Sequence, residues 1–169
     1  MKNINIKNLD KRILAIFVLF NIILLLFFGN ILIRIIFFLF CVIFLYYFGS
    51  IPIDADPVPI TTFIMLMLFD YKSAIGYLIF VLPVADMIAS RFNQYSFVNF
   101  TSVLVSLSIM FLLKNILSTY FLIIIFLLLF NIIRQIIYIL MGQGFRSIIA
   151  PFSHFVIYFV IAYPISLFL

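Results

Sequence analysis

Residues 76–115 read GYLIFVLPVADMIASRFNQYSFVNFTSVLVSLSIMFLLKN, two long apolar runs separated by a short polar break around Arg91. A membrane-spanning α-helix needs about 20 mainly apolar residues, and each run comes close to that length. Polar residues between two such runs are typical of the short turn that joins neighbouring spans. This stretch therefore predicts two membrane helices joined by a tight connection.

The rest of the chain has the same character. Of its 169 residues, 68% are hydrophobic and 9% are charged, whereas soluble domains are about half apolar and a quarter charged. We expect an all-α polytopic transmembrane helical bundle of six or seven spans, forming a single domain over residues 1–169. Apolar runs place the spans at about 13–28, 31–48, 57–70, 73–90, 96–113, 118–141 and 147–169.

The breaks between runs differ in strength. Gly29-Asn30 is a turn-type dipeptide and favours a tight hairpin between the first two spans. The three prolines of SIPIDADPVPI, residues 50–60, predict a surface loop because proline lacks a backbone donor and disfavours helix at the preceding residue. The run at 57–70 has only about 14 residues before Asp70, so it is short for a span and can also be re-entrant or interfacial.

The basic residues indicate the orientation. Four of them precede the first apolar run, which lacks a small-x-small cleavage site, so we expect a retained span rather than a signal peptide. With a cytoplasmic N-terminus, seven spans place seven Lys and Arg residues inside and three outside, whereas six spans give six and four. The charge rule therefore favours seven spans, and we expect a multi-pass cell-membrane protein with its N-terminus in the cytoplasm. Near the span ends lie tyrosines typical of the headgroup layer: Tyr46, Tyr47, Tyr71, Tyr95, Tyr120 and Tyr138.

Asp86 is the sharpest polar feature, because a carboxylate near the bilayer core costs a few kcal/mol and usually pairs with a cation or serves a function. Arg91 lies about 140° away on a helical wheel, so we expect each to seek a partner on another span. Arg134, with Asn131 and Gln135 beside it, is the first candidate partner for Asp86. A structural ion pair, a substrate or proton site, and a headgroup contact remain open.

Two other acidic residues and the single histidine suggest chemistry. Asp54 and Asp56 could share Mg²⁺, but Asp56 before Pro57 is also typical of a helix N-cap with proline at the first position. Since the chain has no Glu and few Asp, we expect no metal site and no cofactor. His154 lies inside the last span, where a buried neutral histidine, a proton relay and a ligand contact are all possible.

Small polar residues gather on the span at 96–113. Asn99, Thr101, Ser102, Ser106 and Ser108 can let helices pack closely and hydrogen-bond to one another. A serine hydrolase would need an activating base nearby, and one histidine without a nucleophile-elbow motif supports that poorly.

The middle of the chain resembles a known family. A proline-bearing loop with Pro52, Pro57 and Pro59, the run GYLIFVLPVADMIAS and the serine-bearing span NFTSVLVSLSIMFLLKN follow one another over residues 50–115. This arrangement is similar to the rod-shape protein MreD and the related S-components of energy-coupling-factor transporters, which have six spanning helices. The resemblance implies a role in cell shape or in transport, and it carries over Asp86 alone.

Too few ionisable groups are present for most catalysis, so we expect a non-catalytic transport or scaffold subunit. Its partners would be the lipid bilayer and other membrane proteins. Nucleic acid is set aside because no basic run exceeds two residues. The alternative is an intramembrane enzyme acting on a lipid-linked substrate. That enzyme would need Asp54, Asp56, Asp86, Arg91, Arg134 and His154 to converge.

Overall fold

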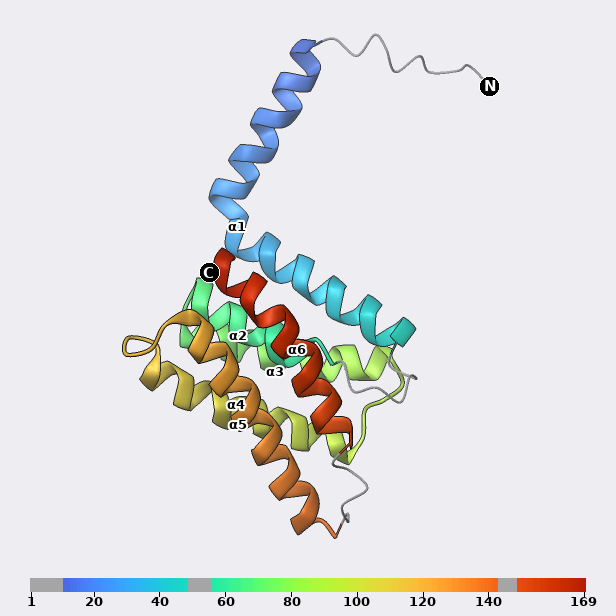
Figure 1. The fold of residues 1–169 in the computed structure, drawn as a ribbon. Coiled ribbons are helices and arrows are strands. Elements are labelled where there is room, and N and C mark those ends of the chain that lie inside the picture. Colours follow the sequence, from blue (N-terminus) through green and yellow to red (C-terminus); the bar gives the residue numbers. More distant parts are fainter. Residues whose placement is uncertain (1–10, 49–55, 143–148) are drawn as a thin grey trace. The chain divides into compact units, whose positions relative to one another are not determined.

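The computed structural model describes the backbone of residues 11–48, 56–142 and 149–169, and the side chains of 30–48, 56–142 and 155–169. Over these ranges the fold is all-helical (Figure 1). The helices are α1 (Lys11–Phe48), α2 (Val58–Leu68), α3 (Tyr71–Ile88), α4 (Gln94–Leu113), α5 (Thr119–Leu140) and α6 (Ile149–Phe168). Four stretches in the described part are long and apolar enough to cross a membrane: Asn30–Phe48 within α1, and all of α3, α4 and α5. The expected class, a helical membrane protein, agrees with this architecture.

Helix α1 overturns one expectation, because it runs through the Gly29-Asn30 dipeptide where a hairpin was predicted. A single glycine costs a helix only about 1 kcal/mol relative to alanine, and no proline interrupts this apolar segment. In lipid, an unbroken helix also keeps the backbone hydrogen bonds satisfied. The chain forms two compact units, residues 1–36 and 37–169, with the boundary inside α1. All side-chain contacts discussed below belong to the second unit.

The other helices lie where their apolar runs predict, and their ends agree with the predicted limits to within two residues. Helix α2 has 11 residues, about 16 Å at 1.5 Å per residue, and is shorter than a span. Pro57 already has helical dihedrals, φ −78° and ψ −13°. Asp56 Oδ1 accepts from the Val58 amide at 2.9 Å. Asp56 therefore caps this helix, as one of the two interpretations of Asp56-Pro57 predicted.

Helix α2 is nevertheless part of the core. Its buried residues include Phe63 and Met65, both fully shielded from solvent, and Asp56 ahead of it is only 2% exposed. The Tyr158 hydroxyl donates to the Asp56 carbonyl at 2.8 Å. Tyr158 is the tenth of the twenty residues of α6, so α2 begins beside the middle of α6. The predicted surface loop at 50–60 is wrong for its last residues, since 56–60 are buried and lead into α2.

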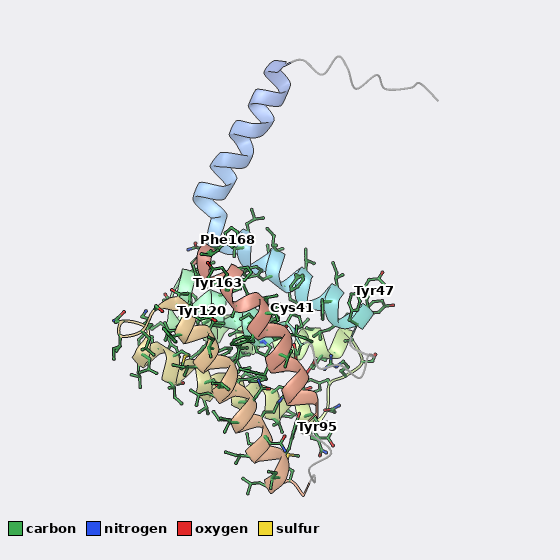
Figure 2. All side chains as sticks on the ribbon, in the orientation of Figure 1. Cys41, Tyr47, Tyr95, Tyr120, Tyr163 and Phe168 are labelled. Carbon is green, nitrogen blue, oxygen red and sulfur yellow. The ribbon has the colours of Figure 1, made fainter. Side chains whose placement is uncertain are left out.

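Helices α4, α5 and α6 pack as antiparallel neighbours. Tyr95 at the start of α4 meets Tyr138 near the end of α5, with ring centroids 5.7 Å apart. Tyr120 at the start of α5 meets Tyr163 near the end of α6 at 6.2 Å. Figure 2 shows Tyr120 and Tyr163 together at one end of the bundle and Tyr95 at the other. These rings lie at helix ends, where interfacial tyrosines are expected.

Aromatic packing fills the interior and apolar side chains cover much of the outside. Phe63 of α2 contacts Phe126 of α5, with centroids 5.0 Å apart. Large apolar side chains such as Leu112, 72% exposed, and Ile116, 74% exposed, point outward. Such a surface suits a bilayer, whose acyl chains take the place of water around it.

Candidate functional site

Asp86 is buried at the last turn of α3, with 4% of its surface exposed. Its Oδ2 accepts a hydrogen bond from the Ser96 hydroxyl of α4 at 2.5 Å. A hydrogen bond to a buried acid holds the two groups in one geometry, because breaking it leaves a polar group without a partner in an apolar interior. The partner of Asp86 thus lies on another helix, as expected, but it is a serine and not a cation.

The five-residue separation between Asp86 and Arg91 has a backbone explanation. The Arg91 amide donates to the Asp86 carbonyl at 2.8 Å, and the Ser90 amide donates to the Met87 carbonyl at 3.0 Å. Ser90 has φ 55°, in the left-handed region. These features define a Schellman motif, in which the amide of the residue after the left-handed one donates to the carbonyl five residues earlier. Arg91 therefore caps the helix end that carries Asp86.

This ending corrects the helical-wheel argument. Helix α3 stops at Ile88, so the 100° step per residue does not extend to Arg91. In the described part of the chain, no ion pair joins Asp86 to Arg91.

Helix α4 begins with a capping box that shares Ser96 with Asp86. The Asn93 side chain accepts from the Tyr95 amide at 2.8 Å. The Ser96 hydroxyl oxygen accepts from the Asn93 amide at 3.3 Å while its proton points to Asp86. The positive end of the α4 dipole also faces this carboxyl. Sequence reasoning missed this network, because Asn93 is a typical N-cap residue but Ser96 is not the Glu or Gln that marks a capping box in a sequence.

Arg134 is buried deeper in the bundle, at 2% exposure. One of its terminal nitrogens donates to Asn131 Oδ1 at 3.1 Å, and Asn131 in turn donates to the Leu127 carbonyl at 2.7 Å. The guanidinium carbon lies 4.9 Å from the centre of the Phe130 ring. Arg134 thus contacts its own helix through one hydrogen bond and a cation–π contact.

The expected ion pair between Asp86 and Arg134 does not form. Arg134 lies one turn inward from Tyr138, and Tyr138 packs against Tyr95 at the start of α4. Arg134 is therefore level with Asn99, whereas Asp86 meets α4 a turn earlier, at Ser96. Antiparallel packing separates the Asp86 and Arg134 side chains along the helix axes, and Ser96 takes the place that Arg134 was expected to fill.

The α4–α5 seam is our name for Asn99, Ser102 and Ser106 of α4 together with Asn131 and Arg134 of α5. All five are buried. At 100° per residue, the three α4 residues point within about 40° of Tyr95, and the two α5 residues within about 40° of Tyr138. Since Tyr95 and Tyr138 contact each other, the two polar sets face each other across the helix pair.

Hydrogen bonding in the seam is incomplete. The Ser102 hydroxyl donates to the Val98 carbonyl at 2.8 Å. The side-chain oxygens of Asn99 and Ser106 are buried and have no hydrogen-bond partner in the part of the chain that the structure describes. The prediction that small polar groups of this span bond across helices is confirmed for Ser108, whose hydroxyl lies 2.6 Å from the Tyr71 hydroxyl. It is wrong for Asn99.

A second polar cluster lies at the start of α2. The Tyr77 hydroxyl donates to Thr61 Oγ1 at 3.3 Å, and the Cys41 sulfur lies 3.4 Å from the same oxygen. Thr61 itself donates to backbone carbonyls one turn earlier, at Pro57 and Val58. This cluster connects α1, α2 and α3, and its hydrogen bonds are of the kind that hold membrane helices together.

The remaining candidate residues lie outside the described side chains. Asp54 and His154 are both in this group, so the structure places neither of them at a site. Among the described residues, no three His, Cys, Asp or Glu side chains come together as a metal site would require. Searches of protein-family models, curated proteins and solved structures find no match to this chain.

Proposed function

We propose that this protein is a non-catalytic integral membrane subunit that serves as a scaffold for other membrane proteins. The observation that carries this proposal is the position of the Asp86 carboxyl and its hydrogen bond. Its carboxyl is hydrogen-bonded to Ser96 and sits between two capped helix ends. A catalytic or proton-carrying acid needs access to a reacting group or to a proton path. Asp86 instead joins α3 to α4.

The rest of the described polar contacts support the same role. Interhelical hydrogen bonds join α1, α2 and α3 through Thr61 and Tyr77, α3 and α4 through Tyr71 and Ser108, and α6 to the start of α2 through Tyr158. Each of these bonds fixes one helix against another. A rigid bundle with an apolar exterior is a suitable platform for partner helices in the bilayer.

The topology follows as part of the proposal. We place the N-terminus in the cytoplasm, with α1 as one crossing and α2 as a re-entrant helix. Arg91 then lies on the cytoplasmic side and Lys72 and Lys114 on the other side. This arrangement puts most Lys and Arg residues inside, in keeping with the positive-inside rule.

The resemblance of residues 50–115 to MreD gives the scaffold a specific setting. These residues include α2, α3 and α4, and with them Asp86, the single residue that the resemblance carries over. We therefore propose partners among the membrane proteins that build the cell wall and set cell shape.

Copurification from native membranes in mild detergent tests this role. The bait is the tagged full chain, and the matched control is Asp86→Leu, which breaks the α3–α4 junction. Recovery of cell-wall enzymes with the unaltered chain, and their loss with the variant, is the expected result. Recovery of an ATPase instead would identify a transport subunit and overturn the scaffold proposal.

One observation favours that second candidate, a solute-binding transport subunit. Asn99 is 8% exposed and its side-chain oxygen has no hydrogen-bond partner among the described residues. A substrate-binding membrane protein keeps such groups for its ligand. A transport subunit would therefore bind its solute at the α4–α5 seam, whereas a scaffold needs no ligand there.

A further inference from the structure

Ser106 differs in its hydrogen bonding from the other hydroxyl residues on the middle of α4. Thr101, Ser102 and Ser108 each donate to the carbonyl four residues earlier, at 2.9, 2.8 and 2.9 Å. Such a bond is the usual way in which a helix satisfies a serine or threonine in an apolar environment. Ser106 is fully buried, and its oxygen has no partner in the described part of the protein.

Asn99 shows the same deficit on the same face. Its side-chain oxygen is buried without a partner, and seven residues separate it from Ser106, which is about 10 Å along the helix. Both side chains point toward α5, as the direction of Tyr95 indicates. A buried amide or hydroxyl without a hydrogen bond is costly, and native structures rarely leave one so. Two on one buried face indicate that further polar molecules supply the missing bonds.

The chemistry of the seam restricts what those molecules can be. An amide oxygen only accepts, so the occupant must donate to Asn99. The Ser106 hydroxyl can both donate and accept, so an occupant that does both is favoured. Burial of the site among apolar side chains penalises a charged occupant. A neutral hydroxyl satisfies all three conditions.

We propose that the α4–α5 seam is an intramembrane binding site for neutral hydroxyl groups, which hydrogen-bond to Asn99 and Ser106 in the middle of the bundle. The hydroxyls come either from water or from a small polar solute. This site is independent of the scaffold role, because it involves neither Asp86 nor Ser96. Its failure would therefore leave the scaffold proposal standing.

Thiol accessibility tests the proposal in the full-length protein. In a Cys41→Ala background, Asn99→Cys is exposed to a small hydrophilic methanethiosulfonate reagent. The control is Val103→Cys, on the same helix at 0% exposure but turned about 80° from the Tyr95 direction. We expect labelling at Asn99→Cys to be at least about ten-fold faster. Labelling no faster than at Val103→Cys would overturn the proposal.

Two sample states distinguish the sources of the hydroxyl. Equal labelling rates in native membranes and in washed, purified protein identify water. Slow labelling in membranes that becomes fast after washing identifies a bound solute. If Asn99→Cys does not yield a monodisperse protein, Ser106→Cys replaces it, with Leu107→Cys as its equally buried control.

Thermal stability gives a second reading. In an empty seam the buried Asn99 amide would only destabilise the fold, so Asn99→Leu would raise the midpoint of unfolding by several degrees. An occupied seam loses its hydrogen bonds in this variant, and we expect the midpoint to fall by about 3 °C or more. A rise would overturn the proposal.

Discussion

The Ser96 hydroxyl donates to Asp86 Oδ2 at 2.5 Å, and through this bond the first turn of α4 holds the last turn of α3. The intervening connection, Ala89 to Asn93, leaves α3 through a Schellman motif and enters α4 through a capping box. Both helix ends are thus satisfied locally, and the side-chain bond fixes the angle between them. This junction is the best-defined polar structure in the described part of the chain.

Removing the Ser96 hydroxyl should destabilise the junction. In Ser96→Ala, Asp86 keeps its burial but loses its donor, and we expect a loss of about 1–3 kcal/mol in the free energy of unfolding. Ser102→Ala is the matched control, since that serine is equally buried in α4 and bonds only to its own helix. Thermal unfolding in detergent measures both. Equal shifts for the two variants would show that the Asp86 contact contributes nothing.

Replacing Ser90 with glycine should stabilise the protein. Its φ of 55° places a side chain in the left-handed region, which costs a non-glycine residue about 1 kcal/mol. Ser90→Gly should therefore raise the unfolding midpoint by a few degrees, whereas Ser90→Val should lower it. Ala89→Gly is the control, because φ is −77° there and glycine brings only added backbone entropy. A lowered midpoint for Ser90→Gly would contradict the Schellman ending.

Asn131 should resist replacement by a larger apolar residue. Its Oδ1 accepts from the buried Arg134 guanidinium, and hydrogen bonds to charged groups are worth about 1.5–3 kcal/mol. We expect Asn131→Leu to destabilise by about 2 kcal/mol although leucine is more hydrophobic. The exposed Asn115→Leu serves as its control. Unchanged folded yield and unfolding midpoint for Asn131→Leu would show that Arg134 does not depend on this acceptor.

Cysteines placed at positions 72 and 114 should be accessible from one side of the membrane, and a cysteine at position 91 from the other. The start of α3 meets the end of α4, where Tyr71 stacks on Phe111 at 4.9 Å, while Arg91 follows the opposite end of α3. Single cysteines at these three positions in a Cys41→Ala background can be tested with an impermeant maleimide on intact cells. We expect labelling at the two lysine positions alone. Labelling of all three, or of Arg91→Cys alone, would reject the proposed topology.

Tyr158→Phe should loosen α6. The hydroxyl of Tyr158 supplies a hydrogen bond to the Asp56 carbonyl, at the buried start of α2, and a bond of this kind contributes about 1 kcal/mol. Tyr163→Phe provides the comparison, because Tyr163 is 62% exposed. Limited proteolysis and thermal unfolding should both separate the two variants. Identical behaviour would mean that α6 is held by apolar packing alone.

The site was only partly predictable. Asp86 and Arg134 stand out because charged residues are rare in apolar runs, and the structure finds both buried. The prediction that they pair was wrong. It rested on their opposite charges, and the sequence does not show at which height along α4 each residue lies. Ser96 has no such signature in the sequence, since a serine at a helix start is ordinary.

The sequence by itself determined the class of the protein and the limits of most of its helices. Apolar runs dictate helix in lipid because only helices or closed barrels satisfy the backbone there, and the cap at Asp56 follows from local chemistry. Tertiary structure decided the burial of α2 beside the middle of α6 and the partner of Asp86. The physical reason is that helix formation depends on residues within about four positions of one another, whereas the facing side chain of another helix depends on how the whole bundle packs.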